Sequence, residues 1–267
     1  MQRDVAAELE VEINAPTTLE FQIAVAPHPG AQVTESLSFV LDGRPVEALE
    51  ISGTHGNRIH KFDAGVGHLR VDYSATIVGY ADPPPVTEYD QSMYLRPSRY
   101  AESDKLFGFA GTEFGQLNDS ATLLERVSSW VGQRLQYVPG SSDPIDGAVD
   151  TMLAGAGVCR DYAHLVVALL RAVKVPARLV SVYAPGLYPM DFHAVAEAFV
   201  EGQWRVVDAT LLAPRDSLVR IATGRDAADT AFLTTAGGRV ELTMIEVSAV
   251  CDDALPDDDL TSAVRLG

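Results

Sequence analysis

One short segment, GAGVCRDYAHL at residues 155–165, contains a residue that could act as a nucleophile. Its cysteine, Cys159, follows Gly155 and Gly157 and opens a run with helical periodicity. A thiol at a helix N-terminus faces unpaired backbone N–H groups, which favour the thiolate, and the N–H of Cys159 could donate to a developing oxyanion. The glycines would let a substrate backbone approach closely. The alternative is a small buried thiol that only fills space, so partner residues must decide.

A nucleophilic thiol needs an imidazole to take its proton, and the imidazole needs an acceptor that fixes its tautomer. Four of the six histidines lie in the first 70 residues, and His164 falls away from the thiol's face of the expected helix, which favours a structural role. His193 begins a strand-like run, and Asp208 ends the next one. A hairpin around Gly202 would bring these two almost opposite each other. The residues therefore indicate one chemical group formed by Cys159, His193 and Asp208.

Zinc binding is a chemically allowed alternative for the same three side chains. Structural zinc sites usually have four ligands, and no close-spaced Cys/His pair in the chain supplies a fourth. We therefore predict no metal site and no cofactor.

The second half of the chain supplies the elements that would position this group. The periodicity predicts a helix from about residue 119 to 135, a short helix near 144–153, and a buried helix from Cys159 that ends at Pro176. Strand-like runs follow at residues 177–184, 193–202 and 203–210. A buried helix packed against an antiparallel sheet is an α+β arrangement.

The first half of the chain has a different hydrophobic pattern. Residues 1 to about 80 alternate apolar and polar positions in short runs between turn clusters, which predicts antiparallel strands in a β-sandwich-like domain. Residues 81–100 contain three consecutive prolines and Pro97, which favours an extended linker. We therefore divide the chain into a β-rich domain over residues 1–100, with the proline-rich linker at its end, and a second domain over residues 101–267.

Four ordered motifs give the second domain a resemblance to a known family. They are GVCRDYA, RAVKVPAR, HAV and WRVVDAT, between residues 157 and 210. The chain from about 119 to 212 resembles the core of the transglutaminase-like superfamily of cysteine proteases and acyltransferases, whose bacterial members carry G-x-C-x-D-x-A, R-x-x-x-x-P-A-R, H-A-W and W-x-x-x-D-x-T segments. The resemblance implies a papain/transglutaminase-like core, and the β-rich first half is similar to the region that precedes this core in many bacterial members.

By motif position, the resemblance implies that Cys159 is the nucleophile, His193 the base and Asp208 the acid that orients it. Tyr137, in LQYVP, and Gly157 would border the substrate. The chain departs from the family pattern at Val195, where tryptophan is usual, and at Ala209, where proline is common. Neither position carries a reacting group, although the first could reshape the cleft wall.

The resemblance implies a thiol-dependent amide hydrolase that forms a thioester on Cys159, acting on a peptide or protein amide. Acyl transfer to an amine, as in a transglutaminase, is the alternative outcome of the same intermediate. We favour hydrolysis because water is abundant and no feature of the sequence indicates a dry amine tunnel. A non-catalytic peptide-binding module is a further alternative, although all three chemical positions are occupied by competent residues.

Charge narrows the range of partners. The 267 residues carry 20 Lys and Arg against 37 Asp and Glu, a net charge of −17, without any basic run. Nucleic acid and anionic membranes would repel such a protein, so we expect neither as a partner. The start of the chain has acids where a signal peptide would have basic and then apolar residues, and the two cysteines offer at most one disulfide, so we expect a cytoplasmic protein. The oligomeric state is not predicted.

Overall fold

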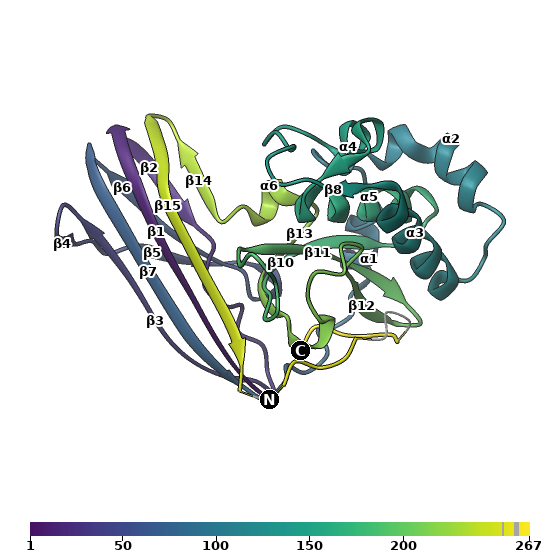
Figure 1. Ribbon diagram of the computed structural model, residues 1–267, viewed down its shortest axis with the longest axis horizontal. Helices are drawn as coiled ribbons and strands as arrows, with labels where there is room; N and C mark the ends of the chain where they lie inside the picture. Colours follow the sequence, from purple (N-terminus) through teal and green to yellow (C-terminus); the bar gives the residue numbers. More distant parts are fainter. Residues whose placement is uncertain (253, 259–261) are drawn as a thin grey trace.

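The computed structural model describes residues 1–252, 254–258 and 262–267. The chain forms two lobes, a β-sandwich and a mixed lobe in which helices cover one small sheet (Figure 1). This confirms the α+β class and the β-rich first domain that the sequence predicts. None of the described helices is both long enough and apolar enough to cross a membrane.

Two antiparallel sheets build the sandwich. The first has the order β15-β1-β7-β3-β4, with bounds Arg239–Cys251, Gln2–Ala15, Gly67–Val78, Gln32–Leu41 and Arg44–Pro45. The second has the order β14-β2-β6-β5, with bounds Leu233–Ala236, Thr17–Phe21, Arg58–Ala64 and Leu49–Ser52. Strand β1 shows why the alternation predicts a sandwich: Leu9, Val11 and Ile13 are buried, and the acids between them are not.

The sandwich draws two of its strands from the far end of the chain. The division at residue 100 placed residues 233–251 in the second domain, whereas β15 pairs along almost all of β1, from Arg3↔Cys251 to Ala15↔Arg239, and β14 pairs with β2. Local patterning cannot identify such partners, because β1 and β15 are separated by more than 200 residues of sequence. The C-terminal boundary of the sequence-based domain division is therefore corrected.

The mixed lobe is built on a four-stranded antiparallel sheet of order β12-β11-β10-β13. The strands run Gln203–Val207, His193–Val200, Ala177–Tyr183 and Val219–Gly224, so the three predicted strands are found and β13 is added. The helices are α1 Glu88–Met93, α2 Ser103–Phe114, α3 Ser120–Arg134, α4 Ala148–Ala154, α5 Cys159–Ala172 and α6 Ala227–Thr230, with 3₁₀ turns at Thr54–Gly56 and Arg215–Ser217. A short parallel pair, β8 Gln136–Tyr137 with β9 Ala156–Gly157, precedes α5.

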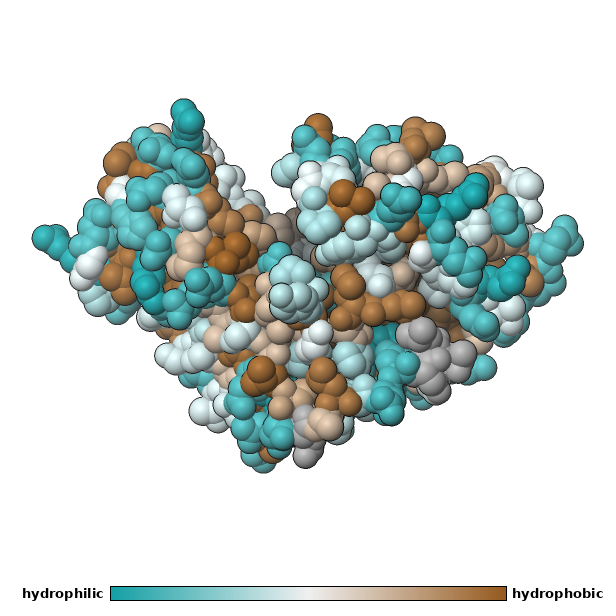
Figure 2. All heavy atoms as spheres, viewed as in Figure 1, coloured by the Kyte–Doolittle hydropathy of each residue, from teal (hydrophilic) through white to brown (hydrophobic). Residues whose placement is uncertain are grey.

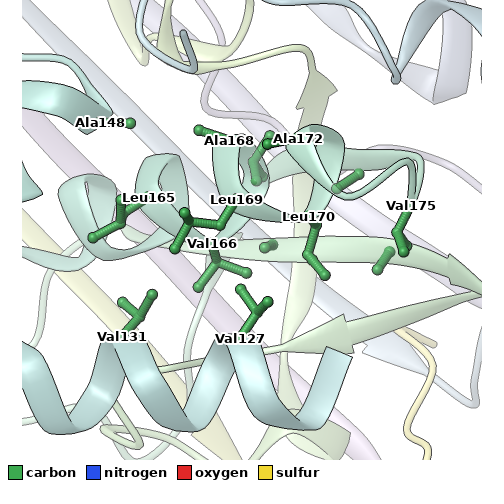
Figure 3. Close-up of a cluster of buried hydrophobic side chains, with 14 of the residues drawn as sticks. Val127, Val131, Ala148, Leu165, Val166, Ala168, Leu169, Leu170, Ala172 and Val175 are labelled. Atoms are coloured by element: carbon green, nitrogen blue, oxygen red, sulfur yellow. The ribbon is translucent and has the colours of Figure 1, made fainter. Parts of the chain in front are cut away.

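Helix α5 is the centre of the mixed lobe. Leu165, Val166, Leu169 and Leu170 are almost completely buried, and they pack against α3, α2 and β11 (Figure 3). Helix α3 begins where the sequence predicts, because Asp119 accepts a hydrogen bond from the Thr122 N–H as an N-cap. Burial on nearly every side holds α5, and with it Cys159, in a fixed position.

The lobes share an apolar interface. Tyr183, at the end of β10, belongs to the sandwich core and donates its hydroxyl hydrogen bond to the carbonyl of Ile23 at 2.8 Å. Val219 and Ile221 of β13 belong to the same core. The proline-rich segment carries α1, and the Ala177 N–H donates to the carbonyl of Tyr94 just after that helix. The chain joining the lobes is therefore partly packed against the mixed lobe.

Candidate functional site

Cys159 is the first residue of α5, as predicted, and it is partly exposed. Helix α4 ends at Gly155, which adopts a left-handed conformation with φ 68°, and β9 then leads directly into the new helix. Asp161 caps the start of the helix, because the Val158 N–H donates to its Oδ2 at 2.8 Å and leaves the first turn well ordered. The thiol is therefore fixed beside the positive end of the helix dipole.

The packing around residue 157 explains why a glycine stands there. A Cβ at this position would lie 2.7 Å from the Cβ of Asp161 and 2.9 Å from its Oδ2. Only glycine lets the capping carboxylate approach this closely. The substrate contact that the sequence predicts for Gly157 stays a prediction, and the structure shows that the space where a Cβ would lie is filled by Asp161.

His193 and Asp208 meet as the hairpin predicts. Strands β11 and β12 pair with Val200 opposite Gln203 and Ala196 opposite Val207, so Asp208 follows the last paired residue of β12 and lies alongside the start of β11. The His193 Nε2 and the Asp208 Oδ2 are 2.7 Å apart, and both side chains are buried. The other ring nitrogen, His193 Nδ1, is buried without a partner in hydrogen-bonding geometry. An open ring position of this kind suits a proton acceptor or donor.

The pKa of His193 shows that Cys159 lies close to the His193–Asp208 pair. Burial alone would lower the pKa of His193, but the Asp208 carboxylate, together with the Cys159 thiol beside the ring, raises it to about 10. Burial would likewise raise the pKa of Asp208, yet His193 and the hydrogen bonds from Thr210 hold it below its usual value. The site therefore favours a charged imidazolium that lies between the Asp208 carboxylate and the Cys159 sulfur.

Tyr137 lies beside the thiol. Burial and the nearby Cys159 side chain raise the pKa of Tyr137 to about 12, while the Cys159 backbone N–H opposes that rise, and Asp191 and Asp208 add to it. Its ring lies 6.0 Å from the ring of Tyr162, one turn along α5. The phenol thus lies beside the Cys159 N–H, the group that the sequence suggests as a donor to an oxyanion.

Other motif residues are structural. His164 is buried, its Nε2 accepts from the Ala227 N–H, and its ring stacks on Tyr100. Arg178 is buried against Glu197 at 2.7 Å, with its guanidinium 4.0 Å from the centre of the Trp204 ring. Both side chains hold the lobe together away from the thiol.

A cavity of about 360 Å³ opens beside Asp208. Its lining includes Ser128 and Gln133 from α3, Tyr162 from α5, and Thr210 and Leu211 from the loop after β12. Among the described residues, no group of three His, Cys, Asp or Glu side chains is placed to bind a metal ion.

Comparison with known proteins gives the family. Residues 111–209 match the model of the transglutaminase-like superfamily. The crystal structure of a "putative cysteine protease" from Cytophaga hutchinsonii shares 33% sequence identity over 98% of this chain and 96% of that one, with a TM-score of 0.88. The chain belongs to the transglutaminase-like superfamily. An uncharacterised protein of Mycobacterium leprae is 25% identical over 150 residues, 52% of this chain and 53% of the relative, so the match spans about half the length of that relative.

Two further residues of this transglutaminase-like site, Thr210 and Asp191, were not predicted from the sequence. The Thr210 N–H and hydroxyl donate to the Asp208 Oδ1 at 2.9 and 2.6 Å. The motif WRVVDAT held this signal, because a hydroxyl two residues after an aspartate commonly closes a turn on its carboxylate. Asp191 lies two residues before His193: burial raises its pKa and His193 opposes that rise, while Asp191 in turn adds to the raised pKa of Tyr137. Nothing in the sequence marks Asp191 beyond its position.

Proposed function

We propose that this transglutaminase-like protein is a thiol-dependent amide hydrolase, a cysteine peptidase that uses Cys159, His193 and Asp208 as a catalytic triad. The observation that carries the proposal is the His193 ring, which is bonded to Asp208 through Nε2 and leaves Nδ1 open beside Cys159. One ring nitrogen is thus fixed, and the other is free for proton transfer with a thiol.

The reaction follows from these positions. The Cys159 thiol gives its proton to His193 Nδ1, and its Sγ attacks the carbonyl carbon of an amide and forms a C–S bond while negative charge develops on the carbonyl oxygen. The imidazolium then gives its Nδ1 proton to the amide nitrogen, the C–N bond breaks, and an amine leaves a thioester on Cys159. A water molecule next gives a proton to Nδ1 and attacks the thioester, which releases the acid and restores the thiol.

Asp208 has a supporting role in this scheme. Its carboxylate stabilises the imidazolium and fixes the ring so that Nδ1 stays on the thiol side. Thr210 in turn holds the carboxylate through Oδ1. Buried groups that are positioned before the reaction need little reorganisation when charge moves.

The developing oxyanion needs a donor, and the Cys159 N–H is a backbone group that could supply it. Tyr137 lies beside that N–H, so its hydroxyl could serve as a second donor to the oxyanion of a bound substrate. Tyr137 therefore remains a candidate substrate-contact residue in the proposal.

The test uses amides of four kinds, because the same attack fits each: a peptide bond, an isopeptide, a glutamine side chain and a cell-wall amide. Released amine is measured alongside the mass of acid-quenched protein. Wild-type protein should release amine and carry a thioester on Cys159, Cys159→Ala should do neither, and Cys251→Ala should match wild type. Turnover by Cys159→Ala at the wild-type rate would contradict the proposal.

Hydrolysis and acyl transfer are separated in the same assay by adding a primary amine. If the protein is a hydrolase, the acid remains the main product when the amine is present. Quantitative incorporation of the amine would instead establish a transglutaminase.

A further inference from the structure

Strand β14 has a free edge. It is the first strand of its sheet, paired with β2 on one side, and no described strand pairs with the other side. The Gln22 N–H donates to the carbonyl of Phe232, and antiparallel pairing alternates, so Thr234 bonds to β2 in the same way. Leu233 and Thr235 therefore direct their N–H and C=O groups away from the sheet.

Strand β14 is only four residues long, and apart from this shortness nothing in it protects the edge. Its sequence, LTTA, contains no charge and no proline, and three of its four residues are exposed. Natural edge strands are commonly blocked by lysine, proline or a bulge, because bare backbone groups recruit another strand. An unblocked edge of this kind is a template for an extended polypeptide.

The edge faces a hollow of the molecular surface. Figure 2 shows a deep notch between the sandwich and the mixed lobe. Strands β14 and β15 form the sandwich side of this notch, with α6 and β13 toward its base (Figure 1). A chain lying along β14 would thus run between the two lobes.

The same edge leads to the candidate site. Phe232, immediately before β14, stacks on Phe192 with ring centres 5.2 Å apart. Phe192 immediately precedes His193. The beginning of β14 is therefore connected, through two packed rings, to the imidazole that faces Cys159.

We propose that the free edge of β14 binds an extended segment of a polypeptide substrate, which adds to the sheet as a further strand while the amide to be attacked lies at Cys159. This inference rests on the proposed function for the reaction at Cys159. Because backbone groups make the contact, the site would accept many sequences, and small amides would be too short to use it. The substrate class is thus an unfolded or extended protein segment rather than a small amide.

The test removes one donor without touching the existing ladder. Proline at position 235 lacks the N–H that points into the notch, whereas the bonds from Thr234 to β2 remain. Ser52→Pro is the matched control, because β5 is the opposite edge of the same sheet. The Gly53 N–H donates to the carbonyl of Asn57, so the backbone of Ser52 also points outward.

Binding is measured in the Cys159→Ala background with fluorescein-labelled casein, an unfolded polypeptide, so that no turnover is needed. Thr235→Pro should weaken casein binding by about tenfold, the loss of one backbone hydrogen bond with added steric interference, and Ser52→Pro should bind like its parent. Equal binding by Thr235→Pro and its parent, or no casein binding by the parent, would overturn the proposal.

Hydrogen exchange keeps the test decisive if the proline variant misfolds. Casein bound to the unaltered β14 should protect the amides of Leu233 and Thr235, whereas that of Thr234 is already bonded. Absence of added protection would refute the docking surface. Protection in a protein that cleaves no amide would leave the docking surface standing and refute the proposed function.

Discussion

The substitution Asp208→Asn tests how the carboxylate controls His193. The raised pKa of His193, about 10 against an ordinary value near 6.5, corresponds to about 5 kcal/mol of preference for the imidazolium. In the variant, the Thr210 N–H and hydroxyl still require an oxygen at the Oδ1 position. The amide NH₂ must then face the His193 Nε2, which can only accept from it. The neutral ring carries its proton on Nδ1, and burial now dominates its pKa.

Histidine NMR measures the pKa of His193 directly. In wild-type protein the Cε1–Hε1 signal of His193 should titrate near pH 10, and in Asp208→Asn it should titrate below 6.5. Turnover should fall by about 10⁴-fold, as when the acid of a serine triad is changed to its amide. Asp191→Asn is the control, because Asp191 makes no hydrogen bond to the ring. In this variant the titration of His193 should stay near that of wild type. An unchanged titration in Asp208→Asn would refute the electrostatic argument.

The remaining predictions concern reactivity, packing and pH. Cys159 should react with iodoacetamide at pH 7 far faster than Cys251. Equal rates for the two cysteines in mass-spectrometric mapping would contradict the activation of Cys159. Gly157→Ala should lower the free energy of unfolding by about 1–3 kcal/mol in urea titrations, because the new Cβ displaces Asp161, whereas Gly108→Ala, with open space around it, should not. The pKa of His193 is raised in the folded state, so the stability that its pairing with Asp208 contributes should be complete below about pH 6.5 and be lost as the pH rises to about 10. If the difference in unfolding free energy between wild type and Asp208→Asn did not shrink above pH 10, this pH dependence would be wrong. Limited proteolysis should cut first within residues 81–87, which have no regular structure, yet the fragments should remain associated through the interface around Tyr183; release of a separate lobe would contradict the shared core.

Local patterns were sufficient for much of the site. The short loop at Gly202 fixes the pairing of β11 and β12, so the approach of His193 to Asp208 follows from counting residues along two strands. The start of α5 at Cys159 likewise follows from the glycine break and the apolar run after it. Both features depend on residues close together in sequence.

Features that depend on distant segments were not predictable in this way. The alternation in β15 indicates a strand, but only the folded chain shows that its partner is β1. The packing of Gly157 against Asp161 was not predictable either, because nothing in the sequence shows that the Asp161 side chain lies so close to this glycine. Helix α2 was missed as well, because its glycines at 108 and 111 weaken the helical pattern and only packing against α5 compensates.

The most direct test of the Cys159–His193–Asp208 unit is a double-mutant cycle on Cys159 alkylation at pH 6, which needs no substrate. An ordinary thiol with a pKa of about 8.5 is only about 0.3% thiolate at this pH, so rapid alkylation reports the imidazolium beside the sulfur. His193→Ala and Asp208→Ala should each slow the reaction, and the double variant should be no slower than His193→Ala alone, because Asp208 acts through the ring. Rate losses that multiply, or a His193→Ala protein that reacts as fast as wild type, would contradict a single Cys159–His193–Asp208 unit.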